Sequence, residues 1–345
     1  MKLATILKII KVNAQIKLKQ FFGIKPIIPY KLLIELTTRC NLKCQVCSIW
    51  KTPSEDLSTE FLENALERFG KQLYWISLSG GEPTLYPHLD ELVRLIQIHC
   101  PNLALITFTT NGQQPHKALE FAKKLQLTCP EIFVTVSLDG DEKLHNDLRQ
   151  DNQAYQRAQE CLSLLNLHKI QTFYGVTIQN RNAEYYETLK VLPSKMKAIT
   201  FSHSNGIYRQ TNKLNTPKIN NALANILKIY KIEKISEFLE HAHIAGIVYF
   251  LKHKQTKHPI PCEVMHSSFH LSYDGHMRYC MYLPPLFHAK ELQKDFHFPI
   301  EQYLLQKESI KKEKCPGCWL NCYSPHSMML HPLKTIFMWF KVLNS

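Results

Sequence analysis

The sequence lacks several features, and each absence excludes a class of protein. Glycine is sparse, at 11 of 345 residues, and charged residues are 21% of the chain, which does not fit a disordered or fibrous protein. No stretch approaches the ~18 apolar residues of a membrane-spanning helix. The lysine-interrupted start lacks the apolar run of a cleavable signal peptide. We therefore expect a globular chain in a reducing cytoplasm, large enough for one large domain or for one domain plus a smaller one.

Cysteine, in contrast, is abundant and unevenly placed. The chain has 11 cysteines, an odd number, and a disulfide framework would require export. Cys100, Cys129 and Cys161 stand singly and suit buried, small apolar positions. The others form two clusters, which in a reducing compartment more often bind metal than form disulfides.

The net charge of +13 favours anionic partners in general: nucleic acid, an acidic peptide or an anionic membrane surface. The lysines are dispersed, and no zinc finger, RRM or helix-turn-helix pattern is present. We therefore do not expect nucleic acid binding.

Short apolar runs alternate with helical patterns over the first two thirds of the chain. This alternation predicts βαβ units, a parallel sheet and an α/β fold, with the chemistry at the carboxyl ends of the strands. The predicted strands cover residues 31–36, 73–79, 103–109, 131–138, 170–178 and 198–203. Residues 205–260 are helical and lysine-rich, without strand alternation.

The first cysteine cluster, Cys40, Cys44 and Cys47, follows the first predicted strand with the spacing C-x3-C-x2-C. A structural zinc ion would need a fourth ligand from elsewhere. Three local thiolates suit a [4Fe–4S] cluster that leaves one iron open. On spacing alone both interpretations stay open.

The stretch "TTRCNLKCQVCSIW" resembles the signature of radical S-adenosylmethionine (SAM) enzymes. The resemblance implies a partial (β/α)6 TIM-like barrel, in which the open iron binds the amino and carboxylate groups of SAM. An electron, supplied by a donor such as flavodoxin or ferredoxin, then cleaves SAM, and the 5′-deoxyadenosyl radical abstracts a hydrogen from substrate. Val46 departs from the family pattern, which often has an aromatic residue there.

The turn "SGGEP" resembles the family element that holds the SAM amino group. Glycines would let backbone carbonyls approach an ammonium closely, and a carboxylate would balance its charge. The residues concerned are Gly80, Gly81 and Glu82.

Further candidates for SAM binding follow later predicted strands. "TTNG" and "VSLDG" resemble family strand ends, and Ser137 and Asp139 would reach the SAM ribose. Arg149 would pair with the SAM carboxylate, since a guanidinium matches carboxylate geometry. The alternative for Arg149 is a solvated arginine at a helix start.

The second cysteine cluster lies within residues 262–322. Asp274–Gly275 predicts a hairpin turn that would hold Cys262 and Cys280 side by side. The far end contributes Cys315, Cys318 and Cys322, and a structural zinc site also fits these spacings.

Taken with the first cluster, the second resembles the auxiliary-cluster extension called SPASM, or its shorter form, twitch. That resemblance implies one auxiliary [4Fe–4S] cluster, because fewer cysteines are present than in the full form. It leaves open which of the last three thiols is spare.

Both ends of the chain are apolar and basic. Helical spacing of apolar residues within 3–22 predicts an amphipathic helix, and the tail "HPLKTIFMWFKVLNS" is apolar, aromatic and lysine-bearing. These ends would dock on an anionic membrane surface, peripheral to its inner face. The alternatives are packing on the barrel flanks or binding of a partner protein.

The sequence thus predicts five segments: a basic helix (1–29), a radical SAM core (30–205), a helical connection (206–260), an auxiliary-cluster domain (261–324) and an apolar basic tail (325–345). The leading functional expectation is peptide or protein modification. Two alternatives stay open: a small-molecule, sugar or lipid-linked substrate at the membrane surface, and a non-catalytic zinc-binding scaffold.

Overall fold

The computed structural model describes residues 3–22, 29–193, 196–201, 216–233, 235–253, 258–292, 318–320 and 322–344. Its strands form one nine-stranded sheet in the order β6-β5-β4-β3-β2-β1-β7-β8-β9. The strands are β1 Lys31–Glu35, β2 Trp75–Ser79, β3 Leu105–Thr110, β4 Ile132–Ser137, β5 Gln171–Ile178, β6 Met196–Phe201, β7 Ser268–Leu271, β8 His276–Arg278 and β9 Phe287–His288.

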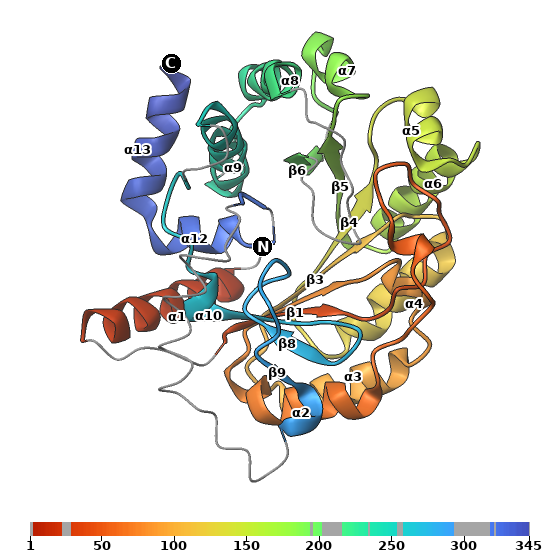
Figure 1. Ribbon diagram of the computed structural model, residues 1–345, viewed down its shortest axis with the longest axis vertical. Coiled ribbons are helices and arrows are strands. Elements are labelled where there is room, and N and C mark those ends of the chain that lie inside the picture. The colour runs from red at the N-terminus through yellow and green to blue at the C-terminus, as the bar shows by residue number, and fades with distance from the viewer. Residues whose placement is uncertain are drawn as a thin grey trace.

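Strands β1 to β6 run parallel, as the alternation predicts, and each lies beside its neighbour in sequence. Helices follow the outer side of this curved sheet, which gives the open barrel seen in Figure 1. The α/β fold with a mainly parallel sheet is therefore confirmed.

Helices alternate with the parallel strands, as the sequence predicts, and further helices follow them along the chain. The helices are α1 Leu3–Phe21, α2 Thr59–Phe69, α3 Leu89–His99, α4 Pro115–Gln126, α5 Glu142–Arg149, α6 Ala154–Leu167, α7 Ala183–Thr188, α8 Thr216–Ile229, α9 Ile235–Lys252, α10 Val264–Ser267, α12 Ser324–Leu330 and α13 Pro332–Leu343. Short 3-10 turns cover Ile49–Lys51, Gly70–Gln72, Pro83–Leu85 and Ala289–Glu291. Helix α5 was not predicted because it is mostly polar; its signal is the N-cap Asp141, which accepts from the Leu144 N–H at 2.9 Å.

The hairpin predicted at Asp274–Gly275 is confirmed. Strands β7 and β8 pair antiparallel, and Gly275 has φ +81° in the turn. Strand β7 also pairs parallel with β1, in the register Lys31↔Ser268. The cysteine-rich segment therefore continues the barrel sheet through β7.

The two faces of the sheet differ in polarity. In β4, Val134 and Val136 are buried in the main core, whereas Thr135 and Ser137 on the opposite face are half-buried. Thr109 of β3 pairs in register with Thr135, so it lies on the same face, which is the inner face of the barrel. The inner face of the barrel thus presents hydroxyl groups together with the rings of Phe133 and Phe173, and the outer face holds the core beneath the helices.

Candidate functional site

The loop that follows β1 carries Cys40, Cys44 and Cys47. All three cysteines are reduced, outside any disulfide, and partly exposed. The loop is folded on itself: the Cys47 N–H donates to the Cys44 carbonyl at 3.2 Å, and the Trp50 indole donates to the same oxygen at 3.3 Å. Burial raises the pKa of Cys40 to about 12, and the nearby Cys44 and Cys47 add to that rise. Thiolates gathered here call for a positive counter-charge, which a bound metal cluster supplies.

The glycines of the GGEP turn let it pack directly against the cysteine loop. The Gly81 N–H donates to the Thr37 carbonyl, and the Glu82 N–H to the Arg39 carbonyl, both at 2.7 Å. A Cβ on Gly81 would lie 2.2 Å from the Arg39 oxygen, and Gly80 has φ +140°. The chain's own backbone approaches both glycines closely, and their contact with the SAM amino group stays a prediction.

Glu82 is buried and joins the turn to the end of β3. Its Oε1 accepts from the hydroxyls of Thr84 and Thr110, both at 2.7 Å, and from the Thr84 N–H at 3.3 Å. Its Oε2 accepts from the Asn111 N–H at 2.7 Å. Burial raises the pKa of Glu82, and these donated bonds oppose the rise. The carboxylate therefore binds groups of the chain itself, a structural role that sequence reasoning did not foresee.

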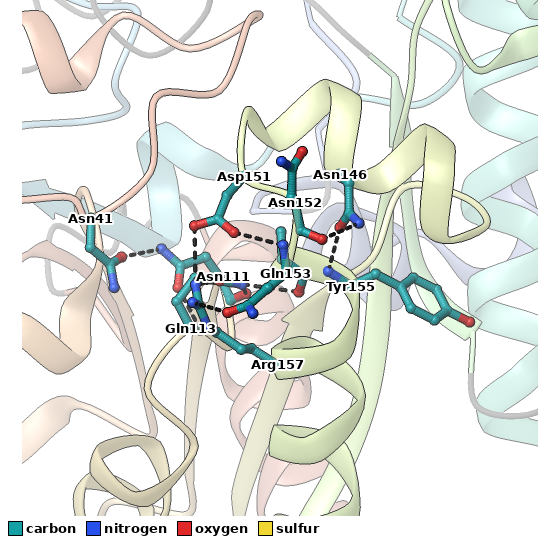
Figure 2. Close-up of polar contacts among 10 residues, drawn as sticks. Asn41, Asn111, Gln113, Asn146, Asp151, Asn152, Gln153, Tyr155 and Arg157 are labelled. Atoms are coloured by element: carbon teal, nitrogen blue, oxygen red, sulfur yellow. Dashed lines mark hydrogen bonds and ion pairs between the residues drawn. The ribbon is translucent and has the colours of Figure 1, made fainter.

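Asn111 extends this network to the cysteine loop, as Figure 2 shows. Its amide donates to Asn41 Oδ1 at 2.7 Å and lies 3.9 Å from the Cys40 sulfur. Behind it, the Gln113 amide donates to the Asn111 carbonyl at 3.2 Å, and Arg157 donates to Gln113 at 3.3 Å. The "TTNG" strand end signalled this position, but the sequence could not show the contact with Asn41.

Asp139 and Arg149 form a buried ion pair on the other side of the loop. The Arg149 Nε and Nη2 atoms lie 2.8 and 2.7 Å from Asp139 Oδ2, and Nη1 lies 3.8 Å from the Cys44 sulfur. Burial disfavours the charged guanidinium, but attraction to Asp139 and Cys44 outweighs this and raises the pKa of Arg149. Arg149 is the last residue of α5, and its side chain is only 15% exposed and paired with Asp139, so the alternative of a solvated arginine at a helix start is wrong.

The predicted candidates thus surround the cysteine loop on two sides, with Gly80, Gly81 and Glu82 on one and Asp139 and Arg149 on the other. Ser137 is half-buried at the end of β4, close in sequence to the ion pair. Within the described ranges, no group of three His, Cys, Asp or Glu side chains is arranged for a single metal ion. Three reduced cysteines, one of them beside a guanidinium, fit a [4Fe–4S] cluster, whose ligands are thiolates.

Four cysteines of the second cluster lie around Tyr323. Burial, and more weakly the neighbouring Cys280, Cys322 and Cys318, raise the pKa of this phenol. Its hydroxyl accepts a hydrogen bond at 3.0 Å from the N–H of Met281, the residue that follows Cys280. Cys262 and Cys318 line one small cavity with Tyr323. The fifth candidate, Cys315, lies outside the described residues.

Comparison with known proteins gives the chemistry of the first site. Residues 34–192 match the model of the Radical SAM superfamily. The antilisterial bacteriocin subtilosin biosynthesis protein AlbA of Bacillus subtilis is 24% identical over 318 residues, which are 85% of this chain and 68% of that protein. The mycofactocin maturase MftC of Mycobacterium tuberculosis is 30% identical over 177 residues, and the match covers 49% of this chain but only 43% of the maturase.

Solved structures support the same fold. Native anSMEcpe with bound AdoMet and Cp18Cys peptide has a TM-score of 0.57 at 18% identity, covering 92% of this chain and 98% of that one. SuiB of Streptococcus suis has a TM-score of 0.52 at 18% identity, covering 78% of this chain and 65% of that one. Residues 34–192 are therefore a radical SAM domain, and the protein is an iron–sulfur enzyme that depends on S-adenosylmethionine.

Proposed function

We propose that this enzyme modifies a peptide or protein substrate by hydrogen abstraction. The observation that carries the proposal is the cysteine loop, with three reduced cysteines held between the GGEP turn and Arg149. The names of related proteins support the substrate class: AlbA serves bacteriocin biosynthesis, and a second Bacillus subtilis relative is the sporulation killing factor maturation protein SkfB. The anSMEcpe structure also contains a bound peptide.

In this proposal Cys40, Cys44 and Cys47 hold the catalytic [4Fe–4S] cluster. When bound, the cluster supplies the electron that cleaves SAM to the 5′-deoxyadenosyl radical. The chain's own residues provide the positioning. Glu82 fixes the GGEP turn against the loop, and Arg149 places a positive charge beside the Cys44 sulfur.

The SAM contacts of Gly80, Gly81, Glu82, Ser137, Asp139 and Arg149 remain part of the proposal. Among these side chains, Ser137 faces the barrel interior at a strand end, where a ribose could accept or donate a hydrogen bond. Asp139 is already bonded to Arg149 and to the Thr177 N–H at 3.1 Å, so it would act on SAM mainly by holding Arg149.

The inner face of the barrel favours a polar substrate. Ser77 pairs in register with Thr107, and Thr109 with Thr135, so hydroxyl groups line neighbouring strands on the same face. A peptide backbone can bond such donors and acceptors, whereas a hydrocarbon chain would leave them unpaired. This polarity supports a peptide or another polar substrate over an acyl chain at the reacting centre.

Anaerobic reconstitution tests the enzyme and its substrate class. With SAM and a reductant we expect 5′-deoxyadenosine, measured by chromatography and mass spectrometry, and about eight iron per chain. Cys44→Ala should abolish SAM cleavage. Cys129→Ala makes the same change at a buried, solitary cysteine and should keep it. Stoichiometric zinc and no 5′-deoxyadenosine in the unmodified protein would contradict the proposal.

For the substrate, a deuterated precursor peptide encoded beside the gene would be the first candidate. Transfer of deuterium into 5′-deoxyadenosine, with a mass change in the peptide, would support peptide modification. Modification of a sugar or lipid-linked compound, and no peptide, would favour the alternative.

A second proposal concerns the two ends, which we propose dock the enzyme on an anionic membrane. Figure 1 shows α1 and α13 on the same side of the molecule. In α13, Phe337 is 72% exposed and is flanked along the helix by the basic Lys334 and Lys341. In α1, Val12 and Ile16 are buried, while the predicted apolar stripe is exposed at Ile10, Ala14, Leu18 and Phe21. Exposed aromatic and basic residues of this kind favour an anionic lipid surface.

Vesicle co-sedimentation tests this docking. We expect binding to vesicles with anionic lipid, weakened by salt, and little binding to neutral vesicles. Phe337→Ser should reduce binding several-fold. The control Leu127→Ser changes an exposed apolar residue after α4 and should leave binding unchanged. Equal binding by both variants, or no binding in either lipid, would refute the docking proposal. No helix in the described part of the chain is long and apolar enough to cross a membrane.

A further inference from the structure

A buried lysine lies between the barrel and the second cysteine cluster. Lys31, the first residue of β1, is 1% exposed. Its Nζ donates to the Cys322 carbonyl at 2.5 Å and lies 3.6 Å from the centroid of the Trp75 ring. Both contacts are with uncharged groups. A buried ammonium is costly unless a negative charge compensates it, so its position calls for an anionic neighbour.

A negative charge at the second cysteine cluster would compensate this ammonium. Burial lowers the pKa of Lys31 to about 8, and attraction to Cys322 opposes that fall. Tyr323 follows Cys322, and its hydroxyl accepts a hydrogen bond from the N–H of Met281, the residue after Cys280. This bond holds the segment around Cys322 beside Cys280. The ammonium therefore adjoins a segment that carries two of the candidate cluster ligands.

On its other side, Lys31 reaches the barrel interior. Trp75, which stacks with the ammonium, is half-buried on the inner face of β2, and its indole donates to the Thr107 hydroxyl at 2.9 Å. One charged side chain thus contacts both the face where we place the substrate and the segment where we place the auxiliary cluster.

We propose that Lys31 is a positioning residue for an auxiliary [4Fe–4S] cluster, and that its charge raises the reduction potential of that cluster. This inference rests on the proposed auxiliary cluster. A thiolate-bound cluster is anionic, and its reduction adds one more negative charge. A nearby fixed cation stabilises the reduced form more than the oxidised form, because Coulomb attraction grows with that charge. The carbonyl bond from Nζ also fixes the backbone of one ligand.

The test isolates the auxiliary cluster. A full-length background variant with Cys40, Cys44 and Cys47 changed to alanine removes the catalytic cluster and its signal. In this background, Lys31→Met removes the charge at similar size, and Lys31→Arg keeps it. Lys341→Met is the matched control, because it removes an exposed ammonium that lies 5.8 Å from the centroid of the Tyr249 ring.

The readouts are the iron content and the midpoint potential from a redox titration followed by electron paramagnetic resonance. We expect Lys31→Met to lower the equilibrium constant for reduction of the auxiliary cluster at least tenfold. This lowers the midpoint potential by about 59 mV for one electron. Lys31→Arg and Lys341→Met should keep the midpoint potential close to that of the background variant. An unchanged potential in Lys31→Met would overturn the inference.

Iron content separates the remaining outcomes. Loss of auxiliary iron in Lys31→Met, with retention in Lys31→Arg, would support the positioning role. Loss in both would overturn it, because packing and not charge would then be responsible. A background variant without iron would remove the auxiliary cluster and this inference together. SAM cleavage by the unmodified enzyme would still test the catalytic site separately.

Discussion

Replacing Glu82 with glutamine tests whether this carboxylate holds the GGEP turn in place. The carboxylate accepts on both oxygens, from Thr84 and Thr110 on one and from the Asn111 N–H on the other. A glutamine has a single oxygen. If that oxygen faces the two threonines, the amide group faces the Asn111 N–H, and two donors meet in a buried site.

An unpaired buried donor costs about 1–3 kcal/mol, so we expect Glu82→Gln to lower the free energy of unfolding by about that amount. Because Asn111 also holds Asn41 and lies beside Cys40, the variant should retain less iron in the catalytic cluster.

The assay is denaturant unfolding of the iron-free protein under reducing conditions, with iron analysis after reconstitution. The control Glu91→Gln makes the same chemical change at the surface of α3, where the carboxylate pairs with Arg94 at 2.6 Å. Exposed pairs of this kind contribute about 0–1 kcal/mol. If the two variants lose equal stability and hold equal iron, the buried network does not hold the turn, and the reasoning is wrong.

Three further predictions follow from single contacts. Gly81→Ala places a Cβ 2.2 Å from the Arg39 oxygen, so it should displace the cysteine loop and lose about four iron per chain in an iron assay; full iron would contradict this. Burial lowers the pKa of His326 to about 3, so the folded state resists a proton that the unfolded chain accepts below pH 6.5. Stability should fall by about 1.4 kcal/mol per pH unit as the pH drops from 6.5 towards 3, and His326→Phe should lack this component in thermal unfolding; parallel pH profiles would refute it. Arg149→Met leaves Asp139 buried and unpaired, so unfolding measurements should show a loss of about 3–5 kcal/mol, partly recovered by adding Asp139→Asn; no recovery would argue against the ion pair.

Local patterns were enough to predict the parallel strands and the position of the cysteine loop. Alternating apolar runs mark strands, and the carboxyl ends of parallel strands meet at one edge, which brought Cys40, Glu82 and Asp139 together in the prediction. Helix α5 escaped because it is only eight residues long and mostly polar, so it lacks the apolar run that marks the other elements.

Partners far apart in the sequence could not be predicted. Nothing in the pattern around Glu82 indicates that Thr110 and Asn111 donate to it, because the bond depends on how two strands end beside each other. Lys31 is the stronger case: a lysine at the start of a strand normally lies in solvent, and its partner, Cys322, is near the other end of the chain.

The pairing of β1 with β7 has a consequence for how the protein is made. Strand β1 is synthesised before β7, so one of its edges is covered only when residue 268 has been added. Until then the nascent barrel presents an unpaired edge next to the cysteine loop, which is open to pairing with other chains. A shortened chain ending before β7 would keep that edge exposed, so we expect it to aggregate more readily than a chain that includes β7.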